Sequence, residues 1–197
     1  MRLLFLHGWG FDASIWHGVR AALAPIETCA WDRGYFGAAS QPDPGGPSIA
    51  IGHSLGSLLF AVAPPPGCVG FVAINGFDRF TGEGRVAPRL LDRMRARFAE
   101  APDAVLDDFR LRAGGGAHQG TLVRECLAAD LDRLATIDGR DGMMPQLVLQ
   151  GGEDPILPAG MRDDVFAGTP RMTLAGAGHL LPVSHPDWCA ARIRELL

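Results

Sequence analysis

The pentapeptide Gly52-His53-Ser54-Leu55-Gly56 places a serine between two glycines, where one apolar run ends and another begins. In the pattern G-x-S-x-G, a buried strand turns sharply into a helix and holds the serine in a strained conformation with its hydroxyl exposed. A side chain at either glycine would collide with the neighbouring strand or helix. The helix also points the positive end of its dipole at the serine. The segment therefore predicts that Ser54 is a catalytic nucleophile.

A nucleophilic serine needs a general base, and the base needs an acid to orient it. In folds with this turn, the chain order is serine, then acid, then histidine. Asp154 follows one apolar run and His179 follows the next. We expect both at the carboxyl edge of a parallel sheet, where the serine turn also opens. His179 would take the proton from Ser54, and Asp154 would fix the imidazole tautomer and stabilise the imidazolium.

Two neighbouring residues compete for these roles. Glu153 is an alternative acid, and Asp154 is preferred because Pro155 follows it as a rigid turn. His185 is an alternative base, but it precedes a proline at what the sequence predicts to be a helix start.

An oxyanion hole is the third requirement of such a site. The segment His7-Gly8-Trp9-Gly10 lies just past the first apolar run, and its glycines allow the backbone to come close. The N–H groups of Trp9 and Leu55 are the expected donors, and the indole would form a wall of the acyl pocket. A structural turn with a core tryptophan is the alternative. His7 is expected to be a structural hydrogen-bonding residue.

The elements that position these groups follow from the pattern of apolar runs. Buried strands are predicted within residues 2–10, 26–37, 48–67, 68–77, 146–158 and 171–186. Helices are predicted over 11–25, after the serine turn as far as the prolines near 64, and over 186–197, whereas 37–47 is rich in glycine and proline and should be irregular. Strands that are apolar on both faces and alternate with helices predict an α/β fold, with a mostly parallel central sheet and helices on both faces.

Residues 77–142 interrupt this alternation. They hold 11 of the 18 arginines and no convincing strand, and they predict two or three helices. We interpret them as a helical lid inserted into a core formed by residues 1–76 and 143–197. Only 21 residues separate Asp32 from Ser54, too few for a helix as well as the turns. We therefore expect a shortened α/β fold that lacks a helix between these two strands, with one sheet edge exposed or covered by a partner.

Composition excludes several classes of function. The net charge of −4 argues against a nucleic-acid-binding protein, and the absence of lysine excludes a lysine nucleophile, a Schiff base and a P-loop. No apolar run reaches the roughly 20 residues of a membrane span, and no signal peptide is evident, which favours the cytoplasm. The four cysteines are far apart and form no metal motif. We therefore expect neither a metal nor an organic cofactor.

Taken in order, the segments HGWG, GHSLG, GGEDPILP and GAGHLLPVSHP resemble the α/β-hydrolase superfamily across nearly the whole chain. Within it, the segments LFLHGWGFDASIW, FVAINGFDRFTGEG and GHLLPVSHPDWC most resemble the pimeloyl-acyl-carrier-protein methyl ester esterases of biotin synthesis. The resemblance implies a serine carboxylesterase that removes a methyl group from a carrier-bound acyl chain. Ser54, Asp154 and His179 would form its triad, and Trp9 and Leu55 its oxyanion hole.

The insertion offers a separate argument for a carrier protein as partner. Arg85, Arg89, Arg93 and Arg97 fall four residues apart, which predicts one basic face of a helix, beside an apolar stripe of Leu90, Met94 and Phe98. Acyl-carrier proteins are acidic and carry a phosphate on the prosthetic arm, which arginine suits. The alternative is a solvated helix face.

Two other functions remain open from the sequence. One is a hydrolase of small free esters or of carbon–carbon bonds, in which the lid is a plain cover. The other is a non-catalytic binding module that kept the fold.

Overall fold

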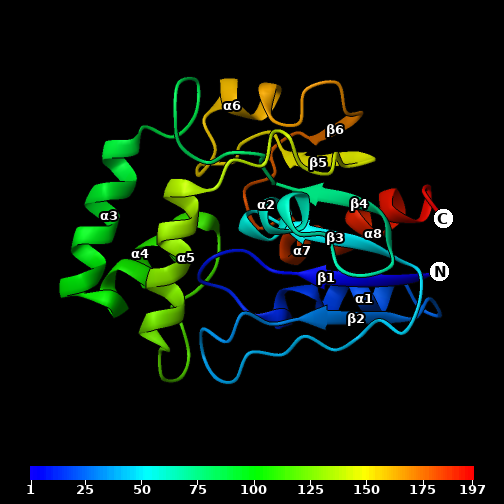
Figure 1. The fold of residues 1–197 in the computed structure, drawn as a ribbon, viewed down its shortest axis with the longest axis horizontal. Helices are drawn as coiled ribbons and strands as arrows, with labels where there is room; N and C mark the ends of the chain where they lie inside the picture. The colour runs from blue at the N-terminus through cyan, green and yellow to red at the C-terminus, as the bar shows by residue number, and fades with distance from the viewer.

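Six parallel strands form the central sheet of the protein, whose computed structural model describes all 197 residues (Figure 1). The strands are β1 (Arg2–Leu6), β2 (Thr28–Trp31), β3 (Ser48–His53), β4 (Cys68–Ile74), β5 (Leu147–Gly151) and β6 (Arg171–Leu174). Their order is β2-β1-β3-β4-β5-β6, and each neighbouring pair is parallel. The predicted α/β architecture is confirmed, and the sheet is wholly rather than mostly parallel.

The central strands are more deeply buried than the edge strands. All residues of β3 and β5 are buried, as is β1 after its first residue. The edge strands β2 and β6 are instead partly exposed, because each has a neighbouring strand on one side only. The near-continuous apolar runs are typical of strands covered on both faces.

Helices cover both faces of the sheet. They are α1 (His17–Ala22), α2 (Leu55–Val62), α6 (Ala159–Asp164), α7 (Leu181–Ser184) and α8 (Pro186–Arg194). The chain moves from β1 to β2 in one direction along the sheet and from β3 to β4 in the other. Right-handed crossovers therefore place α1 and α2 on opposite faces, and α8 packs beside α1.

The predicted helix over residues 11–25 is divided. A short 3-10 helix, η1 (Ala13–Trp16), precedes α1, and the carboxylate of Asp12 caps it by accepting a hydrogen bond of 2.8 Å from the N–H of Ser14. The cap fixes where the turn begins, as aspartate commonly does at this position.

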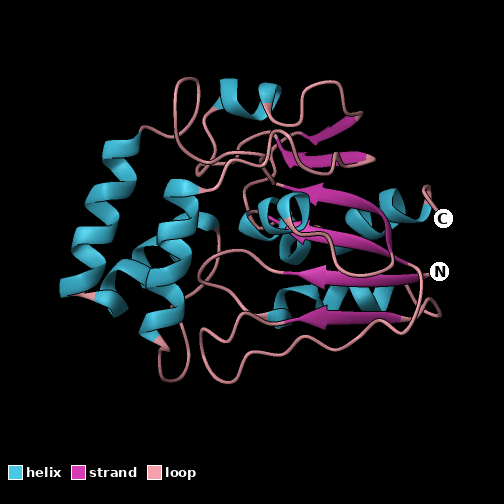
Figure 2. Ribbon diagram, viewed as in Figure 1, coloured by secondary structure: helices cyan, strands magenta, loops and turns pink.

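No helix lies between β2 and β3, as the short spacing predicts. The connecting loop pairs with the end of β2 through an antiparallel bridge between Asp32 and Ser40, and the Trp31 indole donates to the Pro42 carbonyl. Figure 2 shows this long loop running along the β2 edge of the sheet. The chain itself therefore borders part of that edge.

The insertion contains three helices, α3 (Pro88–Glu100), α4 (Pro102–Ala113) and α5 (Arg124–Thr136). They gather beside the carboxyl ends of the strands, while both chain termini lie at the opposite end of the sheet (Figure 1). Buried residues of these helices, such as Phe98, Leu106 and Leu131, belong to the same apolar cluster as the sheet. No helix of the protein combines the length and apolar character that a membrane span requires.

A buried carboxylate joins α5 to the loop after β2. Asp130 is fully buried and accepts hydrogen bonds from the Arg33 guanidinium at 2.6 and 2.8 Å, from the Tyr35 hydroxyl and from Arg133 at 2.7 Å. Burial alone would raise the pKa of Asp130, but the hydrogen bonds from Arg33 and Tyr35 lower it below its ordinary value. The cluster therefore favours the ionised carboxylate and attaches the insertion to the core.

Replacing Asp130 with alanine is expected to lower the free energy of unfolding by roughly 3 kcal/mol, because it leaves Arg33 and the Tyr35 hydroxyl without their buried acceptor. Chemical denaturation at pH 7 measures this loss. Asp132→Ala is the matched control, because Asp132 lies on the same helix and is exposed, and it should cost less than about 1 kcal/mol.

The Asp130 contribution should also depend on pH. A folded-state pKa below the unfolded value means that the stabilisation is complete above the unfolded pKa of about 4 and is lost as the pH falls further. The gap between wild type and Asp130→Ala should therefore shrink below that pH. Equal stability of the two variants at pH 7 would contradict the assigned role.

Candidate active site

Ser54 lies in a strained turn between β3 and α2. Its φ angle is 52°, in a region that residues other than glycine rarely adopt. The N–H of Ser54 donates to the Ile74 carbonyl at 3.0 Å, which holds the turn against β4. A Cβ atom on Gly56 would lie 2.3 Å from the Leu6 carbonyl oxygen, so only glycine fits there. The backbone has the sharp strand-to-helix geometry that the sequence pattern predicts.

His179 and Asp154 form a buried pair. The Nδ1 atom of His179 lies 2.7 Å from Oδ2 of Asp154, and both side chains are inaccessible to solvent. The second carboxylate oxygen accepts from the N–H groups of Ile156 at 2.7 Å and Leu157 at 3.1 Å. Burial would raise the pKa of Asp154, but its interactions with His179, the Ile156 N–H and Asn75 lower it to about 2. The carboxylate is thus ionised at neutral pH and holds a proton on Nδ1.

The remaining ring nitrogen of His179 is available. Its Nε2 atom is buried and has no hydrogen-bond partner, and the hydrogen bond to the Ser54 hydroxyl is not formed in the structure. The two groups nevertheless occupy the same corner of the sheet, because Nε2 of His53 lies 2.9 Å from the His179 carbonyl oxygen. Hydrogen bonds of this kind are often long in unliganded enzymes and shorten when substrate binds.

The His53 ring joins the serine turn to the loop of His179. It is fully buried, and its centroid lies 5.0 Å from that of the His179 ring. Burial, together with the nearby His179, lowers the pKa of His53 to about 3. His53 is therefore neutral at pH 7, and its Nε2–H donates to the His179 carbonyl.

The competing residues lie elsewhere. Glu153 is exposed, whereas the adjacent Asp154 is buried. His185 is also exposed, and its ring contacts the Ser184 hydroxyl at 2.9 Å. His7 is buried, with Nδ1 2.9 Å from the Gly8 carbonyl oxygen and Nε2 accepting from the N–H of Arg33. Its contacts are those of a structural residue.

The two expected oxyanion donors are free. Neither the N–H of Trp9 nor that of Leu55 donates a hydrogen bond within the chain. The preceding Gly8 lies against the serine, because a Cβ atom added to it would be 2.8 Å from Cβ of Ser54. Unpaired N–H groups of this kind beside Ser54 are what an oxyanion hole would require.

The helical insertion holds Trp9 in place, which sequence reasoning missed. The indole N–H donates to the Leu127 carbonyl on α5 at 2.9 Å, and the ring packs edge-on against Phe109 of α4 and Phe98 of α3. Arg110 of α4 also donates to the Gly10 carbonyl at 2.6 Å. All three helices of the insertion thus contact the loop of residues 7–10, which is the expected oxyanion loop.

A cavity of about 840 Å³ opens between α3, α4 and the loop after β5. Fourteen of its 22 lining residues are hydrophobic, a composition that suits an acyl chain better than a polar ligand. Trp9 and Asp154 line it, whereas Ser54 and His179 do not. The cavity therefore adjoins the three candidate catalytic residues rather than enclosing them.

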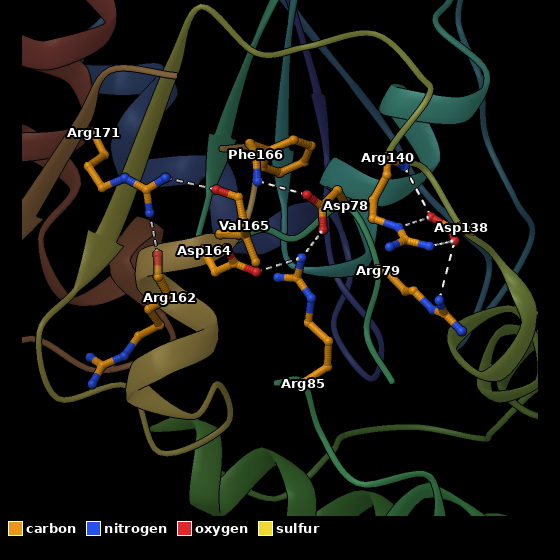
Figure 3. Close-up of polar contacts among 10 residues, drawn as sticks. All are labelled: Asp78, Arg79, Arg85, Asp138, Arg140, Arg162, Asp164, Val165, Phe166 and Arg171. Carbon is orange, nitrogen blue, oxygen red and sulfur yellow. Dashed lines mark hydrogen bonds and ion pairs between the residues drawn. The ribbon is translucent and has the colours of Figure 1, made fainter. Parts of the chain in front are cut away.

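The prediction that Arg85 shares a helix face with the later arginines is wrong. The helix begins at Pro88, and Ala87 before it is extended, because a residue preceding proline disfavours the helical region. Figure 3 shows the Arg85 guanidinium between Asp78 and Asp164, at 3.1 and 3.4 Å. Its side chain is 8% exposed, so Arg85 is a buried structural residue.

The other three arginines lie on α3 and are exposed. Arg89 and Arg93 form no ion pair, and Arg97 pairs with Asp108 of α4 at 3.1 Å with both side chains about two-thirds exposed. Arg93 and Arg97 line the cavity together with Leu90 and Met94 of the expected apolar stripe.

Asn75 was not among the sequence candidates, although it follows β4 as Asp154 follows β5. Its side-chain amide donates to Oδ2 of Asp154 at 2.8 Å. A polar residue directly after a buried apolar strand was the signal that could have identified it.

Comparisons with known proteins agree with this geometry. No family model matches the chain. Two curated relatives are pimeloyl-[acyl-carrier protein] methyl ester esterases. The one from Photobacterium profundum is 25% identical, covering 99% of this chain and 94% of the relative. The one from Pectobacterium carotovorum is 27% identical, covering 94% and 89%.

Solved structures share the fold. An enol-lactonase from Burkholderia xenovorans superposes with a TM-score of 0.78 at 15% identity, covering 98% of this chain and 90% of the lactonase. An esterase from Exiguobacterium antarcticum gives a TM-score of 0.77 at 13% identity, covering 100% and 91%. The chain therefore has the α/β-hydrolase fold, and the curated proteins that it resembles are esterases.

Proposed function

We propose that the protein is a carboxylesterase that hydrolyses the methyl ester of a pimeloyl chain carried by an acyl-carrier protein, a step of biotin synthesis in the cytoplasm. The observation that supports the chemistry most directly is the buried 2.7 Å contact between His179 and Asp154, beside a strained serine. The substrate is inferred from the two esterase relatives and from the apolar cavity.

In the proposed reaction, the Ser54 hydroxyl attacks the ester carbonyl while Nε2 of His179 accepts its proton. The N–H groups of Trp9 and Leu55 stabilise the oxyanion, and Asp154 stabilises the imidazolium. Collapse of the intermediate breaks the bond to the methoxy oxygen, and His179 donates its proton to release methanol. Water, deprotonated by His179, then attacks the acyl-enzyme and frees the acid. These residues and water supply every proton, so no metal or organic cofactor takes part.

The carrier is proposed to dock on the exposed arginines of α3 beside the cavity. Arg89, Arg93 and Arg97 are exposed there, and two of them border the cavity that would receive the acyl chain. The Arg97–Asp108 pair is open to solvent and weak, so it can exchange for a phosphate group of the carrier. Residues 77–142 would then act as a lid that admits the chain and binds its carrier.

Wild-type protein should react covalently with a fluorophosphonate probe, and Ser54→Ala should abolish the reaction. Mass spectrometry of methyl pimeloyl-carrier protein should show loss of 14 Da, one methylene unit, with the wild type only. Failure of the wild type to react with the probe, while a known serine hydrolase reacts beside it, would instead favour a non-catalytic module.

Replacing Arg89, Arg93 and Arg97 together with glutamine should lower kcat/KM for the carrier-bound ester roughly tenfold, since each exposed charge contact contributes up to about 1 kcal/mol. Hydrolysis of free methyl pimelate should fall by much less, because that substrate has no carrier to contact the arginines. Raising the salt concentration should weaken the preference for the carrier-bound ester in the wild type and less so in the variant.

Arg140→Gln is the control for these substitutions, because Arg140 is exposed and pairs with Asp138 away from the cavity. It should leave both substrates unaffected. Equal wild-type rates on carrier-bound and free esters would contradict carrier docking and favour a hydrolase of small esters.

A further inference from the structure

The side chain of Asn75 lies at the point where the acid, the base loop and the serine turn meet. The residue is 1% exposed, and its Nδ2 atom lies 2.8 Å from Oδ2 of Asp154 and 3.4 Å from the Gly178 carbonyl oxygen. Both neighbours are acceptors, so the amide nitrogen must face them. Asn75 therefore contacts the carboxylate and the segment that immediately precedes His179.

The backbone around Asn75 is tied to two of these segments, β5 and the serine turn. Its N–H donates to the Leu149 carbonyl of β5 at 2.8 Å, and the carbonyl of the preceding Ile74 accepts from the N–H of Ser54 at 3.0 Å. Its φ angle is 45°, in the left-handed region that asparagine tolerates better than most side chains. The turn after β4 thus places the amide between the nucleophile and the acid.

The carboxylate needs this donor to keep its orientation. Oδ1 of Asp154 accepts hydrogen bonds from two backbone N–H groups. Oδ2 accepts hydrogen bonds from Nδ1 of His179 and from the side-chain amide of Asn75. Without Asn75, one side of Oδ2 would be buried without a donor, and a buried unpaired acceptor is costly. The carboxylate would then be free to turn away from the imidazole.

The side chain of Asn75 also leaves one polar atom unpaired, which costs free energy of folding. Its Oδ1 atom is buried and has no hydrogen-bond partner. The hydrogen bond that the other end of the amide donates to Asp154 offsets this cost.

We propose that Asn75 is a positioning residue that holds the Asp154 carboxylate toward Nδ1 of His179 and so fixes the orientation of the imidazole that is to take the proton from Ser54. The proposal rests on the proposed serine-hydrolase chemistry and adds a fourth side chain to it. Asn75 acts through Asp154, and the cavity that would receive the acyl chain does not include it. Its loss should therefore change kcat rather than KM.

The test uses two variants: one replaces the hydrogen-bond donor of Asn75 with an oxygen, and the other removes the side chain. Asn75→Asp keeps the shape and the tolerance for a positive φ but replaces the donor with an oxygen facing Asp154. Asn75→Gly removes the side chain and fits the left-handed backbone without strain. The measurements are kcat and KM for p-nitrophenyl butyrate, the rate of covalent labelling of Ser54 by a fluorophosphonate, and the thermal midpoint.

Gln150→Glu is the matched control. Gln150 is a buried amide on the adjacent strand β5 that donates to the Thr173 hydroxyl at 2.9 Å and contacts no triad residue. The change buries a carboxylate in the same sheet, as Asn75→Asp does. It should lower the thermal midpoint without a specific loss of kcat in the folded fraction.

We expect kcat to fall about a hundredfold in Asn75→Asp and about tenfold in Asn75→Gly, the range of one hydrogen bond to a charged group. KM should stay within about twofold, and the labelling rate should fall with kcat. Values of kcat within twofold of wild type in both variants, or losses no greater than those of Gln150→Glu, would overturn the proposal. A wild type that neither hydrolyses the ester nor labels would overturn the proposed function itself.

Discussion

A buried carboxylate is stable only when hydrogen-bond donors surround it, and Asp154 imposes this requirement on the centre of the molecule. Its donors are Ile156 and Leu157 in the loop after β5, Asn75 in the turn after β4 and His179 in the loop after β6. These segments are far apart in the sequence. The parallel sheet brings their carboxyl ends to one edge, and the donors set the pKa of Asp154 to about 2, so that it is ionised when His179 needs a counter-charge.

Hydrogen bonds also hold the serine turn at this edge of the sheet. The N–H of Ser54 bonds to β4, and the His53 ring reaches the carbonyl of His179. The glycine that allows this approach is Gly56, whose missing side chain leaves room for the Leu6 carbonyl. Ser54 and His179, the proposed nucleophile and base, are thereby held near one another by backbone contacts, although no hydrogen bond joins their side chains in the structure.

The helical insertion is part of the same structure rather than an attached cover. Asp130 fastens α5 to the loop after β2, and the Trp9 indole bonds to the Leu127 carbonyl of α5. One of the two free N–H groups beside the serine therefore belongs to a residue whose side chain the insertion holds. A movement of these helices would shift Trp9, which couples the cavity to the oxyanion loop.

The sequence by itself determined the local features, because each depends on neighbours in the chain. The glycines around Ser54 predict the turn, the apolar runs predict the parallel strands, and the proline after Asp154 favours that residue over Glu153. Pro88 also marks a helix start in the sequence, because proline favours the first helical position, and Arg85 precedes it. Only the tertiary structure decided what Arg85, Asn75 and Trp9 contact, because their partners Asp78, Asp154 and Leu127 come from segments that folding alone brings together.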